Sequence, residues 1–183
     1  MKFKFKTQPY QQDAVNNICK VFKGQPYFDM VRYTRDLGIR RKKVEAQIDM
    51  IDTGAFEVND DGFENAKIVL EDADIFANIK KIQQDNNYKE SEELVRGLGR
   101  CSLDIEMETG TGKTYVYIKT IFELNSRYGW SKFIIVVPSI AIREGVKKSF
   151  EMMEDHFMDQ YGKKARYFIY NSKRLSELDS FAS

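Results

Sequence analysis

The stretch from Leu103 to Thr114, LDIEMETGTGKT, constrains this chain more than any other part of its sequence. A short apolar run leads into a glycine-rich turn, and an amphipathic helix is predicted from Lys113 onward. Glycine allows a tight turn that brings backbone N–H groups close to a ligand, and the start of a helix attracts anions. The stretch therefore predicts a phosphate-binding loop (P-loop) between a strand and a helix of an α/β fold.

The residue types in this loop suit the binding of phosphates and of a metal ion. Lys113 supplies a positive charge that reaches the β- and γ-phosphates, and Thr114 supplies a hydroxyl for Mg²⁺, so both are candidate catalytic residues. The strict pattern has glycine at position 107, where this chain has Met107. The alternative is a Gly/Thr turn that Lys-Thr follows by coincidence, but the apolar run before it and the helix after it favour the P-loop. The predicted ligand-binding residues are Thr109, Gly110, Thr111, Gly112, Lys113 and Thr114.

This loop, which lacks the first glycine, is similar to the P-loop of superfamily 2 helicases and DNA translocases. The segment 8–15, QPYQQDAV, resembles the Q motif of the same motors. That resemblance implies that Gln11 reads the adenine edge, a task suited to an amide because it both donates and accepts hydrogen bonds. Phe3 and Phe5 are both candidates to stack on the base. Taken alone, the motif is weak, since a glutamine at a helix start is usually a solvated surface residue.

The chain is predicted to have three parts. Residues 1–25 form an arm and a helix that carries the Q-like motif; Pro9 lies in its first turn, and Gly24 ends it. Residues 26–100 are interpreted as an insertion of mixed α/β structure. Residues 101–183 are the first part of a RecA-like motor domain, in which alternating strands and helices imply a parallel sheet covered on both faces.

The elements expected within the insertion and the motor part follow from hydrophobic periodicity and from turn residues. In the insertion, we expect helices at 40–51 and 73–84, a hairpin with a turn at Asp61-Gly62, and a short helix capped by Ser91. In the motor part, we expect strands at 103–107, 132–137 and 165–170 and helices at 115–125, 141–156 and 172–178.

The segment 138–146 follows the second of these strands and is similar to motif Ia of superfamily 2 motors. Ser139 and Arg143 are candidates to bind a DNA backbone phosphate, because a helix start and a cation both suit one. The alternative is a helix cap with a surface arginine. The basic run 40–43 is a weaker candidate for DNA contact, because most charge runs are solvated helix faces.

Composition limits the other possibilities. The 29 basic and 28 acidic residues leave a net charge of +1, so no basic field covers the whole domain. Cys19 and Cys101 lack metal-ligand spacing and are expected to be inert thiols, and His156 is expected to be solvated rather than catalytic. The start of the chain is not a signal peptide, and no apolar run reaches membrane-span length. A soluble, cytoplasmic protein is expected.

The motifs together resemble the start of the Res subunit of type III restriction enzymes. That resemblance implies ATP and Mg²⁺ as cofactors, double-stranded DNA and a Mod methyltransferase subunit as partners, no membrane, and an ATP-dependent site-specific deoxyribonuclease in the full-length protein. No Asp-Glu-x-x strand follows motif Ia, so the chain is interpreted as an N-terminal fragment that does not hydrolyse ATP well alone. The alternatives are another superfamily 2 helicase, for example one in repair, or a non-catalytic fragment whose insertion binds a partner or DNA. Of these possible functions, a small metabolite kinase is the least supported.

Overall fold

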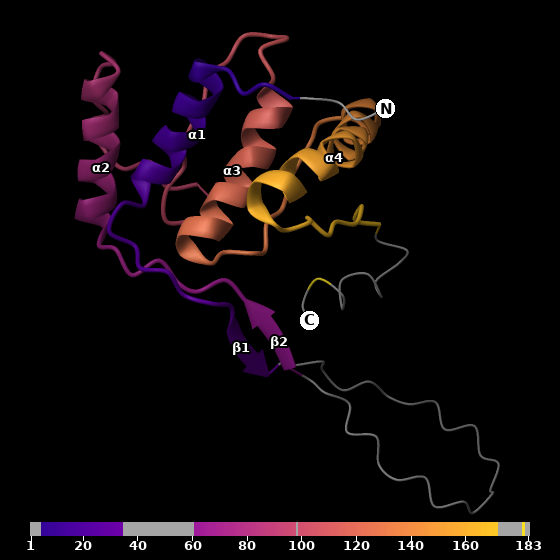
Figure 1. The fold of residues 1–183 in the computed structure, drawn as a ribbon. Coiled ribbons are helices and arrows are strands. Elements are labelled where there is room, and N and C mark those ends of the chain that lie inside the picture. The colour runs from indigo at the N-terminus through magenta and orange to yellow at the C-terminus, as the bar shows by residue number, and fades with distance from the viewer. Residues whose placement is uncertain (1–4, 35–60, 98, 172–180, 182–183) are drawn as a thin grey trace, which may run out of the picture.

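The computed structural model describes residues 5–34, 61–97, 99–171 and 181 of the 183-residue chain. In the described part, helices α2, α1, α3 and α4 lie side by side in that spatial order, and the strands lie apart from them (Figure 1). The elements in chain order are α1 (Pro9–Val21), β1 (Val31–Thr34), β2 (Asp61–Glu64), α2 (Asp72–Asp85), α3 (Lys113–Tyr128) and α4 (Ile140–Tyr161). No helix in the described part is both long enough and apolar enough to cross a membrane.

Helix α1 is central because it packs against both α2 and α3. It begins at Pro9, as predicted, where the missing N–H of proline costs nothing. Val15 and Cys19 on its inner face are completely buried and meet Ile75 of α2 and Val116 of α3 in one core cluster. A fully buried aliphatic side chain contributes about 1.5–3 kcal/mol relative to an exposed one, so this cluster fixes α1 against its neighbours.

A second cluster joins α3 to α4. Its aromatic members stack closely: the rings of Phe122 and Phe157 have centroids 4.7 Å apart and are nearly parallel. Ile118 and Met153 complete the contact between the two helices. The helices predicted at 73–84, 115–125 and 141–156 are thus confirmed as α2, α3 and α4, each somewhat longer than predicted.

Two amide side chains connect the segment before α2 to the rest of the fold. Gln25, after α1, donates to the carbonyl of Lys67 at 3.2 Å and accepts from the N–H of Val69 at 2.9 Å. Asn65 accepts from the N–H of Lys132 at 2.9 Å. Each side-chain amide makes hydrogen bonds to backbone groups that a neighbouring strand would bond in a sheet. These backbone groups are therefore not left without partners.

The predicted parallel sheet is not observed in the described part of the chain, where the only paired strands are β1 and β2, which run antiparallel. The segments 103–107, 132–137 and 165–170 are assigned to no strand. The physical reason is that a strand exists only where its N–H and C=O groups pair with a neighbour, and apolar composition does not supply that neighbour. In the middle segment, Ile134 and Val136 remain 81% and 89% exposed.

Two local predictions in the interval between the motifs are also wrong. Asp61 and Gly62 do not form a turn but lie within β2, where Gly62 is opposite Tyr33 of β1. Ser91 does not cap a helix; its N–H donates to Oε1 of Gln83 at 2.9 Å, and its hydroxyl accepts from Nε2 of Gln83 at 2.8 Å. These two hydrogen bonds with Gln83 take the place of the helix-capping bond that was predicted for Ser91. The helices predicted at 40–51 and 172–178, and with them the basic run 40–43, lie outside the described residues.

Candidate nucleotide-binding site

The predicted P-loop forms a tight turn immediately before α3. Gly110 and Gly112 have φ values of +84° and +89°, which favour glycine. The hydroxyl of Thr111 donates to the carbonyl of Glu108 at 2.6 Å and closes the turn. Helix α3 then begins at Lys113, so the loop lies at the positive end of a helix of 16 residues.

Gly112 also lies close to α1. A Cβ atom at this position would lie 2.5 Å from Nε2 of Gln11, well inside van der Waals contact. At Gly110 the same atom would meet nothing within 4 Å. The loop is thus tightly packed on the side of α1 and open at Gly110.

The tertiary structure brings the Q-like motif and the P-loop together, although they are 100 positions apart in the sequence. Nε2 of Gln11 donates to the carbonyl of Thr111 at 2.9 Å, and Oε1 of Gln11 accepts from the N–H of Gln8 at 3.0 Å. A glutamine amide has two donor hydrogens and two acceptor lone pairs. One donor and one acceptor of Gln11 therefore remain for a further ligand.

The start of α3 has the groups that an anion requires. The first N–H groups of any α-helix lack intrahelical partners, and the first intrahelical bond here runs from Val116 to the carbonyl of Gly112. Lys113 is exposed and has no ion-pair partner in the described part of the chain. Thr114 is half-buried beside it. These groups fit a phosphate chain, and the Thr114 hydroxyl suits Mg²⁺.

Tyr10 also contacts the loop, which the sequence analysis did not predict. Its hydroxyl donates to the carbonyl of Thr111 at 3.1 Å, the same oxygen that Gln11 binds. The only sequence signal for this contact was the aromatic residue directly before Gln11 in the Q-like motif.

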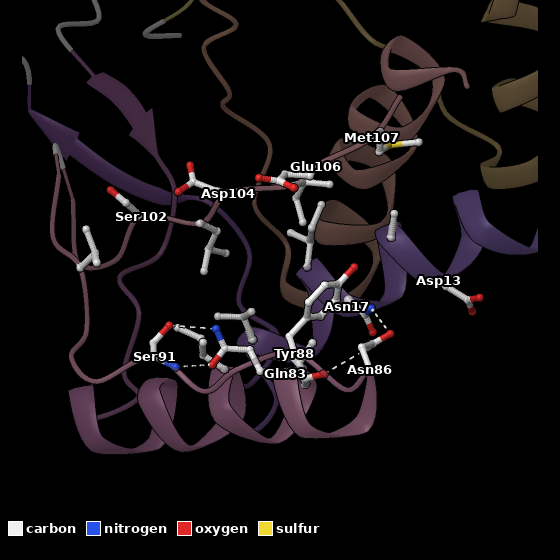
Figure 2. A pocket seen from close by; sticks show the side chains of 18 of the residues that line it. Asp13, Asn17, Gln83, Asn86, Tyr88, Ser91, Ser102, Asp104, Glu106 and Met107 are labelled. Carbon is white, nitrogen blue, oxygen red and sulfur yellow. Dashed lines mark hydrogen bonds between the residues drawn. The ribbon is translucent and has the colours of Figure 1, made fainter. Parts of the chain in front are cut away.

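A large cavity adjoins the loop along the face of α1 that carries Tyr10, Asp13 and Asn17. It measures about 820 Å³ and lies between α1, α2 and residues 102–108 (Figure 2). Its described lining has one ammonium group, that of Lys89, and five carboxylates: Asp13, Glu93, Asp104, Glu106 and Glu108. Carboxylates repel phosphate, so this cavity does not suit the anionic part of a nucleotide. No group of three potential metal ligands occurs in the described residues.

Phe5 packs against α3 and α4 in the half-buried region around Tyr115. Its ring centroid lies 6.4 Å from that of Tyr115 and 5.4 Å from that of His156. Phe3, the other candidate for base stacking, lies outside the described residues. Through these contacts, Phe5 packs the N-terminal arm against α3, the helix that follows the P-loop.

The prediction that His156 is solvated is wrong. It is half-buried, and its Nε2 lies 3.1 Å from the hydroxyl of Tyr115, which also bonds the hydroxyl of Thr7 at 2.6 Å. Burial and the nearby ammonium of Lys119 lower the pKa of His156 below its ordinary value. Cys19, by contrast, is the buried inert thiol expected, because burial raises its pKa to about 11.

Ser139 and Arg143 lie at the start of α4, as predicted, but their contacts are local. The hydroxyl of Ser139 accepts from the N–H of Ile142 at 3.3 Å and so caps the helix. The guanidinium of Arg143 donates to Oε1 of Glu144 at 3.0 Å. The contacts of both residues are those of the alternative prediction, a helix cap and a surface arginine.

A glycine-rich loop at the start of a helix, followed by Lys-Thr, is typical of P-loop proteins. A sequence model of the family described as type III restriction enzyme, res subunit, matches residues 4–177. The chain therefore belongs to this family, which implies a RecA-like helicase fold.

Individual relatives agree with this assignment. Over 112 residues, the chain is 37% identical to the Res subunit of the type III restriction-modification enzyme EcoP15I from Escherichia coli, covering 60% of this chain and 11% of the relative. Over 112 residues it is 35% identical to the EcoPI Res subunit of Escherichia phage P1, with the same coverage. Over 89 residues it is 38% identical to the StyLTI Res subunit of Salmonella typhimurium, covering 47% of this chain and 9% of that protein. The matched regions thus span about a tenth of each relative.

Proposed function

We propose that this chain is the N-terminal, ATP-binding part of the DNA translocase subunit of a type III restriction endonuclease, which cleaves foreign DNA in the complete complex. Three parts are proposed: residues 1–25 carry the Q-like motif, residues 26–100 are an insertion, and residues 101–183 begin the first motor domain. The proposed setting is the cytoplasm, with double-stranded DNA and a Mod methyltransferase subunit as partners. Family membership supports this proposal over a repair helicase.

The observation that supports ATP binding most directly is the hydrogen bond between Gln11 and the carbonyl of Thr111. It joins the proposed adenine reader to the proposed phosphate loop, and Gln11 keeps one free donor and one free acceptor for the base. The residues proposed to bind the phosphates are Thr109, Gly110, Thr111, Gly112, Lys113 and Thr114.

In the proposed mechanism, the chain binds and orients the nucleotide. The ammonium of Lys113 attracts the β- and γ-phosphates, and the hydroxyl of Thr114 would hold Mg²⁺, which when bound would supply positive charge beside the phosphates. We further propose that Ser139 and Arg143 bind a DNA backbone phosphate. Because no Asp-Glu-x-x segment follows them within the 183 residues, we expect these residues alone to bind ATP but not to hydrolyse it well.

A binding measurement with the full chain tests the proposal. Wild type is expected to bind MgATP, and Lys113→Ala is expected to weaken that binding by about 100-fold or more, because hydrogen bonds to charged groups are the strong ones. Lys81→Ala is the matched control, since Lys81 is an exposed lysine on α2 that pairs with Asp85. Equal MgATP binding by wild type and Lys113→Ala would contradict the proposed function.

A further inference from the structure

Two neighbouring side chains of α1 donate to a single carbonyl oxygen of the P-loop. The hydroxyl of Tyr10 lies 3.1 Å from the oxygen of Thr111, and Nε2 of Gln11 lies 2.9 Å from it. Gln11 has a proposed partner in the adenine base, but the proposed function gives Tyr10 no role. A carbonyl oxygen has two lone pairs, so these two donors fill it.

The orientation of this carbonyl determines the direction of the next amide. The carbonyl of Thr111 and the N–H of Gly112 belong to one peptide group, and the described chain has no cis peptide bond. In a planar trans peptide, the C=O and N–H bonds point in opposite directions. Because the carbonyl of Thr111 points at α1, the N–H of Gly112 points away from α1.

The glycine that follows this peptide, in a loop that also contains Gly110, makes its orientation depend in part on outside contacts. Gly110 and Gly112 both have positive φ, and glycine has more accessible backbone conformations than any other residue. The N–H of Thr111 is already used, since it donates to the carbonyl of Glu108 at 3.4 Å. Without donors on the carbonyl of Thr111, fewer contacts hold the Thr111–Gly112 peptide group in this orientation.

We propose that Tyr10 is a positioning residue of the P-loop: its hydroxyl, together with the amide of Gln11, orients the Thr111–Gly112 peptide so that the N–H of Gly112 meets the nucleotide phosphates. This inference rests on the proposed function, because it assumes that the loop binds phosphates. Tyr10 acts on the phosphate part of the ligand and not on its base.

Comparing the binding of two ligands, one with and one without the nucleoside, separates an effect on the phosphates from an effect on the base. The full chain is titrated with MgATP and with magnesium tripolyphosphate, which has the phosphates without the nucleoside. Tyr10→Phe is expected to weaken both by the same factor, about 2- to 5-fold, because it removes one hydrogen bond at a half-exposed site. The matched control is Tyr88→Phe, since Tyr88 lines the cavity beside the loop, is 72% exposed, and has a hydroxyl with no hydrogen-bond partner in the described part of the chain.

Each other outcome overturns the proposal. Weaker binding of MgATP alone would assign Tyr10 to the base, and unchanged binding of both ligands would leave its hydroxyl without a role. Tyr10→Phe could also melt at a lower temperature than Tyr88→Phe and lose affinity only in proportion to its unfolded fraction. The contact of Tyr10 with the loop would then be purely structural. If wild type binds neither ligand, the proposed function itself fails, which is a different result from a wild type that binds both.

Discussion

The P-loop region (residues 108–114 with the start of α1) and the motif Ia region (residues 132–146) each contain an extended segment that leads into a helix. They differ in what positions them. The carbonyl of Thr111 accepts from two side chains about 100 positions away in the sequence. Ser139 bonds a residue three positions away, and Arg143 bonds its neighbour.

This difference follows from the backbone that each region requires. A capped helix start is specified locally, since one hydroxyl can satisfy one of the first N–H groups. A loop with two glycines at positive φ has much conformational freedom to lose and needs contacts from elsewhere. Substitutions that disturb contacts with distant residues should therefore affect the P-loop region. The motif Ia region should be affected by substitutions of its own residues.

The largest effect is expected from a matched pair of glycine substitutions. Gly112→Ala places a side chain at φ +89° and 2.5 Å from Gln11, so we expect a loss of about 1–3 kcal/mol in the free energy of unfolding. Gly145→Ala, in the interior of α4 with nothing within 4 Å, should gain up to about 1 kcal/mol from helix propensity. Urea denaturation measures the change in the free energy of unfolding for both variants. Equal changes would contradict the difference between the two regions.

A cap substitution tests the motif Ia region. Ser139→Ala removes the acceptor of the N–H of Ile142 and should cost about 1 kcal/mol in the free energy of unfolding. Ser139→Asp keeps an acceptor and should retain wild-type stability, but its negative charge should weaken DNA binding if Ser139 contacts a phosphate. Unfolding and DNA titrations on the same samples separate the two roles. Wild-type DNA affinity in Ser139→Asp would remove the DNA role.

Arg143 is expected to affect binding rather than folding. Its side chain is 41% exposed and pairs with Glu144, so Arg143→Ala should change the free energy of unfolding by less than about 0.5 kcal/mol. If it contacts a DNA phosphate, the variant should lower the slope of log affinity against log salt by about one. Arg96→Ala, which disrupts an exposed pair with Asp72, is the control. An unchanged salt slope would contradict a phosphate contact.

The smallest effect is expected from pH. Burial, followed by Lys119, lowers the pKa of His156, while Asp159 raises it less, so the folded chain takes up this proton at a lower pH than the unfolded chain. Stability should therefore fall as pH decreases through about 6.5 and level off below the folded pKa. Comparing unfolding of wild type and His156→Gln between pH 7.5 and about 5 isolates this contribution. The same pH slope in both would show that another group is responsible.

The sequence predicted helices α1 to α4 because their signals are local, whereas the short helix predicted after Ser91 is not observed. Pro9 begins α1, Gly129 ends α3 at φ +79°, and Ser139 caps α4. It also predicted the residues of the P-loop turn, since glycine at positive φ is a local requirement. The predicted strands failed because strand formation depends on a partner, which the segment 132–137 does not have in the described part of the chain.

The order of amino acids alone specifies helices α1 to α4 and the chemistry of the loop, namely two glycines, a lysine and a threonine at the start of α3. What supports that loop depends on how the helices pack. Burial of Val15 and Cys19 between α2 and α3 places α1 beside the P-loop, and this packing brings Tyr10 and Gln11 to the carbonyl of Thr111. Helical periodicity shows which face of α1 is apolar, but it does not show which distant segment that helix will meet.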